Sequence, residues 1–254
     1  MRLTTDAVII REKNISGDDR VITALTKDRG AINAFVNGAK RLRSKNASAT
    51  GLFCYSNITL FKNKDTYIVN EASAIEVFFD IRRDIEKLSL AQYFCEIFMA
   101  LSPQEEPAAE YVELLLRSFY NIVKGSRPLA LIKAVTELRL LCLSGYQPDL
   151  VACSACGEYE KAKMYFDKVN GHLLCSDCIT NSGKAAGGYT ELPAGVLAAM
   201  RHIVYSDMTK IFAFSLKSEG LEFLSDITEK YLLSQTDRTY KTLDFYYSVK
   251  NGII

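Results

Sequence analysis

Apolar residues in the first third of the chain come in short runs that turn-forming residues separate. Runs rich in β-branched and other apolar residues cover residues 7–11, 20–26, 31–36, 57–61 and 66–70. Turn-forming clusters lie at residues 14–19 and 27–30, and the polar segment 62–65 has the form of a hairpin turn. About five short strands at this spacing predict a small β-barrel over residues 1–80.

The pattern beyond the first 80 residues has the wider apolar spacing of helices. Helices are expected at residues 85–101, 107–124, 129–144, 193–205 and 218–234. Pro107 is well placed near the start of one helix, and Gly125 and Pro128 end it. The sequence therefore predicts an α+β multidomain protein, in which a barrel at residues 1–80 is followed by a helical bundle domain at residues 81–254.

The composition of the 254-residue chain is that of a globular protein, with 48% hydrophobic and 24% charged residues. The formal net charge is only +1, so any case for a polyanionic partner must rest on local charge. The first residues lack the apolar stretch of a signal peptide, and no run approaches the roughly 18 consecutive apolar residues of a membrane span. These features predict a cytoplasmic protein.

Four of the seven cysteines form two C-x-x-C pairs. The first pair is Cys153 and Cys156, the second is Cys175 and Cys178, and the 18 residues between the pairs fit a zinc ribbon. A hairpin predicted within residues 158–174, with an Asn-Gly turn, brings the second pair alongside the first. Because four thiolates leave no coordination position for water, the sequence predicts one structural zinc ion per chain in a segment at 150–182.

The cysteines also have alternatives to zinc binding. Redox dithiols are one alternative, but redox C-x-x-C motifs normally occur singly beside a βαβ unit, and this sequence shows none. His172 is an alternative ligand, although four available thiols favour a surface position for it. Cys54, Cys95 and Cys142 lie alone in apolar surroundings and are expected to be small buried hydrophobes.

The segment from Arg29 to Lys64 contains basic residues and no acidic one. Its cations are Arg29, Lys40, Arg41, Arg43, Lys45, Lys62 and Lys64. Four of them fall within residues 40–45, where like charges repel one another unless a partner neutralises them. This cluster favours contact with phosphate groups, and a solvated rim is the alternative.

Aromatic residues interleave with these cations. They are Phe35, Phe53, Tyr55, Phe61 and Tyr67. Small barrels of the OB type hold single-stranded nucleic acid in a cationic groove with aromatic platforms. The alternative is that the aromatics belong to the core: this is the expectation for Phe35 and Phe53, whereas Tyr55 and Tyr67 fit either role equally well.

Segments spread over nearly the whole chain carry a resemblance to a known family. They are Thr5–Arg11, Gly17–Thr26, Gly30, Gly38–Arg41, Glu137–Leu141, Gly145–Pro148 and Arg238–Phe245. In their order and spacing they resemble the RecO family of bacterial recombination mediators. Thr242 and Tyr246 depart from the family pattern, where serine and leucine are more usual, and both changes are conservative.

The resemblance implies an N-terminal OB-fold barrel, a helical domain and an embedded zinc knuckle with four cysteine ligands. It also implies DNA repair and recombination: binding of single- and double-stranded DNA, annealing, association with RecR, and help for RecA in displacing single-strand-binding protein (SSB). DNA binding is expected partly on the barrel, which matches the loop at residues 40–45. A pocket for the SSB C-terminal tail is expected in the helical domain, with Lys133 and Arg139 as candidates; ordinary solvent-facing charges are the alternative for these two residues.

The sequence offers little that favours catalysis. It has two histidines and lacks the G-x-x-x-x-G-K-[ST], H-E-x-x-H, G-x-S-x-G and G-x-G-x-x-G patterns. We therefore expect a non-enzymatic, nucleoid-associated mediator. A zinc-ribbon regulatory protein that acts through protein contacts is the alternative, and a zinc-dependent hydrolase is a third possibility.

Overall fold

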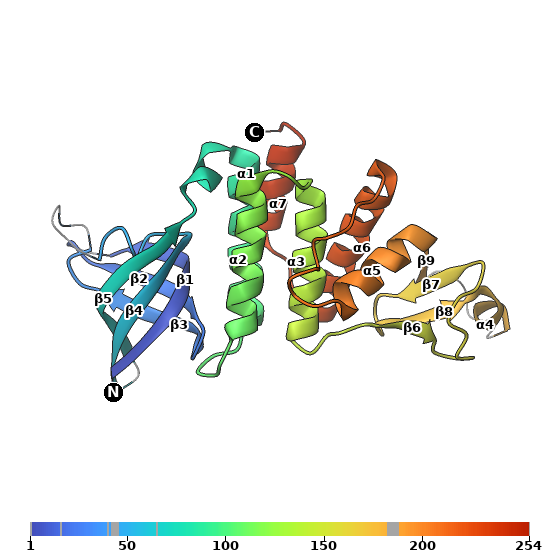
Figure 1. Cartoon of the computed structure of the whole chain (residues 1–254), viewed down its shortest axis with the longest axis horizontal. Coiled ribbons are helices and arrows are strands. Elements are labelled where there is room, and N and C mark those ends of the chain that lie inside the picture. The colour runs from blue at the N-terminus through green and yellow to red at the C-terminus, as the bar shows by residue number, and fades with distance from the viewer. Residues whose placement is uncertain are drawn as a thin grey trace. The chain divides into compact units, whose positions relative to one another are not determined.

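A computed structural model describes residues 2–15, 17–39, 41, 46–64, 66–181 and 188–253 (Figure 1). Contacts group the chain into two compact units. Unit 1 consists of Met1–Ser126 together with Tyr240–Ile254, and unit 2 consists of Arg127–Thr239. The helices that follow the barrel in the sequence are thus shared between the two units, and a division after residue 80 stays a prediction.

A closed five-stranded barrel forms the first part of unit 1. Its strands are β1 (Arg2–Asn14), β2 (Arg20–Thr26), β3 (Gly30–Val36), β4 (Cys54–Asn63) and β5 (Thr66–Val77). They follow the order β1-β2-β3-β5-β4, and all pairs are antiparallel except β3 with β5. Closure depends on the length of β1, since one half pairs with β2 and the other half pairs with β4. The predicted small barrel is confirmed.

Alternating side chains fill the barrel. Inward-facing residues from all five strands form one buried apolar cluster that includes Ile9, Ile22, Ala34, Ile58, Leu60 and Val69. The alternation follows from the period of two residues in a strand. Outward-facing positions are polar or partly exposed on the faces that helices leave open, as Asn33 and Asn70 illustrate. The binary pattern that predicted the strands therefore also determines which side chains are available at the barrel surface.

Four helical segments complete unit 1. They are η1 (Phe79–Arg83), α1 (Ile85–Leu101), α2 (Ala109–Lys124) and α7 (Lys241–Lys250). The Asp84 side chain caps α1 by accepting hydrogen bonds from the backbone N–H groups of Glu86 and Lys87. Gly125, at φ +65°, ends α2 as predicted. Helix α7, which the sequence did not predict, packs on α1, where the Tyr240 and Tyr93 rings lie 6.1 Å apart.

Unit 2 combines longer helices with a small sheet, which is drawn in yellow in Figure 1. The helices are α3 (Leu129–Leu143), α5 (Ala194–Tyr205) and α6 (Ser218–Thr236). The sheet contains β6 (Asp149–Cys153), β7 (Met164–Asp167), β8 (His172–Cys175) and β9 (Tyr189–Leu192) in the order β6-β8-β7-β9, and the short helix α4 (Ser176–Asn181) follows β8. We call these four strands and α4 the cysteine sheet. Among the described helices of the chain, none has the length and apolar character needed to cross a membrane.

Candidate metal centre and nucleic-acid interface

The four paired cysteines occupy strand ends, a turn and a helix of the cysteine sheet. Cys153 ends β6 and Cys175 ends β8, while Cys156 lies in the turn after β6 and Cys178 lies in α4. Gly157 follows the first pair with φ +75°, a left-handed conformation that glycine adopts without strain. Because β6 and β8 are parallel, the two C-x-x-C segments lie at the same end of this pair.

The sulfur atoms of these cysteines converge. All four Sγ atoms lie within 4.8 Å of one another, and those of Cys156 and Cys175 are 3.7 Å apart. Among the described residues this is the one group of metal-ligating side chains so arranged. His172 begins β8, at the opposite end from Cys175, and is not part of the group. The four thiols form a site that can hold a metal ion.

Backbone N–H groups favour the thiolate form of Cys153. Burial disfavours the thiolate of Cys153, but N–H groups of Cys175, Cys156 and Ala155 point at the sulfur and lower its pKa to about 6. In contrast to Cys153, burial raises the pKa of Cys54 and raises that of Cys142 to about 12; both lie outside the site. Cys54 and Cys95 are buried as predicted, and Cys142 is half-buried.

Long polar side chains attach the cysteine sheet to the helices of unit 2. Arg201 of α5 donates to the carbonyl oxygens of Leu150, Val151 and Tyr159 at 2.7–3.0 Å, and its guanidinium stacks over the Tyr159 ring. Gln235 of α6 donates to two carbonyl oxygens of the β7–β8 turn. The cysteine-bearing segments are therefore carried on a sheet that is fixed to helices of unit 2 on two sides.

The cations predicted to bind DNA have different surroundings. Lys40, Arg43 and Lys45 lie outside the described residues, whereas Arg29, Arg41, Lys62 and Lys64 lie within them. Arg41 pairs with Asp18 at 3.3 Å, and Lys62 pairs with Glu105 at 2.9 Å. The acidic partners come from outside the basic segment, so its local charge is lower in the fold than in the sequence.

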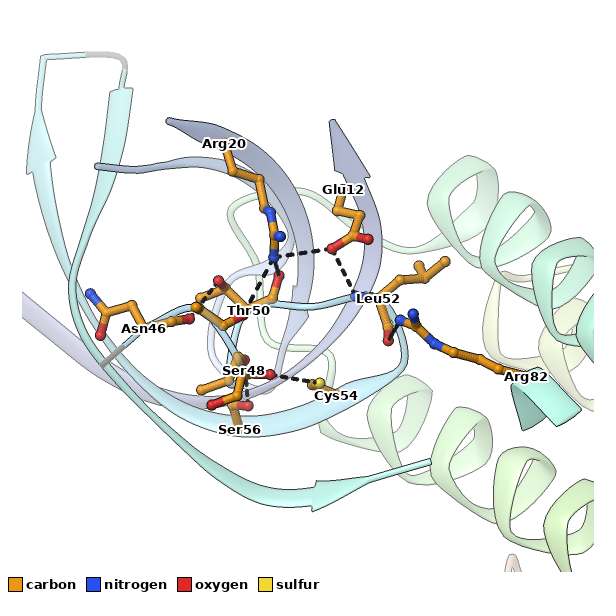
Figure 2. Close-up of polar contacts among 11 residues, drawn as sticks. Glu12, Arg20, Asn46, Ser48, Thr50, Leu52, Cys54, Ser56 and Arg82 are labelled. Atoms are coloured by element: carbon orange, nitrogen blue, oxygen red, sulfur yellow. Dashed lines mark hydrogen bonds and ion pairs between the residues drawn. The ribbon is translucent and has the colours of Figure 1, made fainter. Parts of the chain in front are cut away.

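The chain after the predicted DNA-binding loop is held firmly to the barrel (Figure 2). Arg20 donates to the carbonyl oxygen of Thr50 at 3.1 Å and pairs with Glu12. Glu12 also accepts from the backbone N–H of Leu52, whose carbonyl oxygen accepts from Arg82. The segment that follows the cationic loop is therefore anchored to three different elements, β1, β2 and η1.

The aromatic residues divide between the interior and the surface. Phe53 is buried as predicted, and Tyr67 belongs to the barrel core with its hydroxyl donating to Glu105 at 2.8 Å. The prediction that Phe35 lies in the core is wrong, because 40% of its surface is exposed. Ile32, Ala34 and Val36 take the inward positions of β3, and the two-residue period of a strand then places Phe35 outside.

The strand register reveals a row of side chains that the sequence analysis did not assemble. Phe35 on β3 and Phe61 on β4 are both paired with Ile68 of β5, which lies between them. Directly paired residues project from the same face of a sheet, so these three side chains are neighbours on the outer surface. Phe61 is 45% exposed. We call Phe35, Ile68 and Phe61 the outer row.

Cations flank the outer row at both ends. Arg2 of β1 is paired with Phe61, and Lys13 of β1 is paired with Val21, which in turn is paired with Phe35. Both cations are exposed. The alternation of apolar residues within β3 could have predicted that Phe35 faces outward. That Phe35, Ile68 and Phe61 are neighbours could be recognised only from the order of the strands.

The two residues predicted for an SSB-tail pocket lie on α3. Lys133 is fully buried and pairs with Glu137 at 2.9 Å and with Glu229 of α6 at 2.6 Å. Arg139 is half-buried and donates to the carbonyl oxygen of Val204 at 2.7 Å. The alternative of a solvent-facing charge is wrong for Lys133, whose ammonium belongs to the α3–α6 contact.

A closed five-stranded OB-like barrel, joined to helices and a sheet with a four-cysteine group that can hold a metal ion, defines a multidomain protein of the OB-barrel class. Comparison with known families makes the assignment specific. Residues 1–78 match the family described as Recombination protein O N terminal, and residues 82–244 match Recombination protein O C terminal. The chain belongs to the RecO family of DNA repair proteins, as its sequence motifs indicated.

Curated relatives agree with this assignment over almost the full chain. The DNA repair protein RecO of Acetivibrio thermocellus is 35% identical over 243 residues, which cover 96% of this chain and 95% of the relative. The protein of the same name from Symbiobacterium thermophilum is 29% identical and covers 97% of each chain. That of Alkaliphilus metalliredigens is 26% identical and covers 94% of this chain and 95% of its own.

Proposed function

We propose that this chain is a non-enzymatic recombination mediator that binds single- and double-stranded DNA through its barrel. The outer row is the observation that carries this proposal. Two exposed phenylalanines, one on each side of β5, provide faces on which bases stack, whatever the sequence of the DNA. Arg2, Lys13 and the predicted cations supply charge for the phosphates beside these faces.

The remaining steps follow from binding and require no bond chemistry. Annealing needs only that two strands are neutralised and brought together. With RecR, the protein would help to load RecA onto SSB-coated single-stranded DNA in the cytoplasm, at the nucleoid. The SSB tail would bind near Arg139 and Lys133, where the half-buried Arg139 is the more accessible cation.

Replacement of the outer row tests the proposal. In the variant Phe35→Ala/Phe61→Ala, affinity for a labelled single-stranded oligonucleotide should fall about tenfold or more, because each stacked base contributes roughly 1–3 kcal/mol. Fluorescence anisotropy measures the affinity. Phe79→Ala is the matched control, since Phe79 is 60% exposed and lies in η1. Equal affinities of the double variant and the control would contradict the proposal.

The predicted cationic loop is tested separately. Replacing Lys40, Arg41, Arg43 and Lys45 by alanine should weaken binding and flatten its dependence on salt, because fewer phosphates are neutralised. Unchanged binding across several salt concentrations would exclude the loop as a phosphate-binding element. If the unmodified protein binds no oligonucleotide at low salt, a zinc-ribbon regulator acting through protein contacts becomes the better assignment.

We also propose that the four-cysteine site holds one structural zinc ion. Zinc–thiolate bonds of about 2.3 Å in a tetrahedron place sulfurs about 3.8 Å apart. The 3.7 Å between the Cys156 and Cys175 sulfurs fits this value. Four protein ligands leave no position for a reactive water, so the ion would stabilise the cysteine sheet. Metal analysis of the purified protein should give close to one zinc per chain.

A further inference from the structure

A second candidate site lies on the barrel, beside the outer row. A cavity of about 310 Å³ opens between the outer surface of β1–β3 and the segment that follows α1. The residues that line it include Arg11, Thr23, Asn33, Tyr67, Met99 and Gln104. All of them belong to unit 1, so the cavity forms within one compact part of the chain.

Backbone contacts fix the far wall of this cavity. Ala31 donates to the carbonyl oxygen of Pro103 at 2.9 Å, and Glu105 donates to that of Arg29 at 2.9 Å. Gly30 makes this approach possible, because a Cβ atom there would lie 1.9 Å from the Pro103 carbonyl oxygen. The segment that carries Gln104 is therefore clamped to the barrel edge, and the cavity is built into the fold.

Solvent-accessible hydrogen-bond donors line the cavity. The Thr23 hydroxyl donates to Oδ1 of Asn33 at 2.8 Å, which orients the amide and leaves its NH2 group for a ligand. Within the described part of the chain, neither the Gln104 amide nor the Arg11 guanidinium has a hydrogen-bond or ion-pair partner. A ligand that accepts hydrogen bonds at several points fits this set of donors.

The charge of the cavity favours an anion. Its carboxylate, that of Glu105, already accepts from Lys62 and from the Tyr67 hydroxyl. A neighbouring cavity of about 460 Å³ shares Arg11 and Met99 with the first. In that neighbour Glu12 pairs with Arg20, and Glu96 accepts from the backbone and hydroxyl of Thr242. Arg11, which has no ion-pair partner among the described residues, therefore supplies a positive charge at the border of the two cavities.

We propose that the cavity binds one nucleotide of a single nucleic-acid strand. Arg11 would hold the phosphate, and the amides of Asn33 and Gln104 would hydrogen-bond the polar edge of the base. Asn33 and Phe35 project from the same face of β3, two residues or about 7 Å apart. Adjacent nucleotides of one strand can then occupy the outer row and the cavity. The inference rests on the proposed DNA-binding function and adds a specific site to it.

Single strands are the expected ligand because the site takes a base by its edge. Bases of a duplex have that edge engaged in pairing, whereas an unpaired base is free to present it. A free nucleotide has the same chemistry as a nucleotide within a strand. Competition with thymidine monophosphate distinguishes these two sources.

Two variants with one matched control test the cavity. Arg11→Ala should weaken binding of a labelled thymidine oligonucleotide about tenfold, as for a lost charge-assisted hydrogen bond. The slope of log affinity against log salt should become less negative by about 0.7, the value for one phosphate of a single strand. Lys124→Ala removes the same charge from the exposed end of α2, outside both cavities, and should leave both quantities unchanged.

Gln104→Ala tests the contact with the base, and it tests the cavity even if the Arg11→Ala variant does not fold. Gln104 is exposed and its strand-like bridge to Gly30 uses backbone atoms, so melting should be unaffected. The variant should bind the thymidine oligonucleotide more weakly and bind an abasic oligomer of equal length normally, with an unchanged salt slope.

The outcomes separate the cavity from the proposed function. If the unmodified protein binds DNA and both variants match Lys124→Ala, the cavity assignment fails while DNA binding stands. If the unmodified protein binds no oligonucleotide, both fail. Displacement by thymidine monophosphate as strong as by an oligonucleotide of equal nucleotide concentration would overturn the assignment to a strand.

Discussion

The barrel and the cysteine sheet are both built from short strands and turns, yet different forces hold them together. The barrel closes its own hydrogen-bond ladder and buries inward-facing side chains from all five strands. The cysteine sheet has strands of four or five residues, and its parallel β6–β8 pair has only two register positions, Asp149 with His172 and Cys153 with Leu173. Such a short ladder gains most from a cross-link, and the four thiols are placed to supply one through a metal ion.

The largest effect is expected from removing a metal ligand. Cys175→Ser should abolish stoichiometric zinc and unfold the cysteine sheet, because structural zinc contributes on the order of 10 kcal/mol to the folding of small metal domains. Metal analysis and limited proteolysis within residues 149–192 measure the result. Cys142→Ser, at a half-buried cysteine of α3 outside the site, is the control and should retain the metal. A Cys175→Ser protein that is as protease-resistant as the control would show that the sheet needs no metal.

The reciprocal change is made in the barrel core. Ile58 is fully buried, so Ile58→Ala should lower the free energy of unfolding by about 3 kcal/mol through lost burial and a cavity. Denaturant unfolding measures this loss, and zinc content should stay the same. Simultaneous loss of zinc would show that the cysteine sheet depends on the barrel core for its stability.

The two regions also contain the same surface arrangement, in which one glutamate accepts from a lysine and a tyrosine. Beside the barrel, Glu105 of the segment after α1 accepts from Lys62 and Tyr67; in the cysteine sheet, Glu191 accepts from Lys163 and Tyr165 at 3.1 and 3.0 Å. Both glutamates are 47% exposed, and hydrogen bonds from the lysines lower the pKa of each.

This matched pair tests where DNA binds. Glu105→Gln releases Lys62 beside the barrel surface and should tighten binding of single-stranded DNA about threefold, the size of an exposed ion pair. Glu191→Gln should have no effect on anisotropy titrations. Equal effects of the two substitutions would remove the distinction between a DNA-binding barrel and a structural cysteine sheet.

The smallest effect concerns acid stability of the barrel. The hydrogen bond from Lys27, with one from Asn57, holds the pKa of Asp6 below its ordinary value of 3.8. A carboxyl with a lowered folded pKa stabilises the fold above the ordinary pKa, and this contribution disappears as the pH falls through the folded value. Asp6→Asn should therefore cost less than about 1 kcal/mol at neutral pH and flatten the pH dependence of unfolding below pH 4, measured by chemical denaturation.

Strong local signals made much of the fold predictable. Period-two alternation gave the barrel strands, and the helix expected at residues 85–101 is α1 with the same ends. The Asn-Gly pair gave the hairpin in the cysteine sheet, where β7 and β8 flank residues 168–171. The cysteine spacing gave the four-thiol group, because two C-x-x-C pairs with a hairpin between them need no distant partner to converge.

Features that depend on distant contacts were not predictable. Strand β1 extends from Arg2 to Asn14, well beyond its apolar stretch, because two different partners pair with its polar ends. Two of the predicted DNA-binding cations pair with Asp18 and Glu105. These acidic residues lie outside the segment 29–64, so the charge of that segment alone did not reveal them. The outer row and the Arg11 cavity likewise required the strand register and the segment after α1.

The return of α7 to unit 1 affects how the protein is made on the ribosome. The barrel, α1 and α2 are synthesised before unit 2, but Tyr240 and α7 follow only after residues 127–239. At bacterial elongation speeds this interval is roughly ten seconds. During that time the face of α1 that receives Tyr240 has no permanent cover, so the nascent chain is exposed to chaperones and proteases at this face until translation has passed α7.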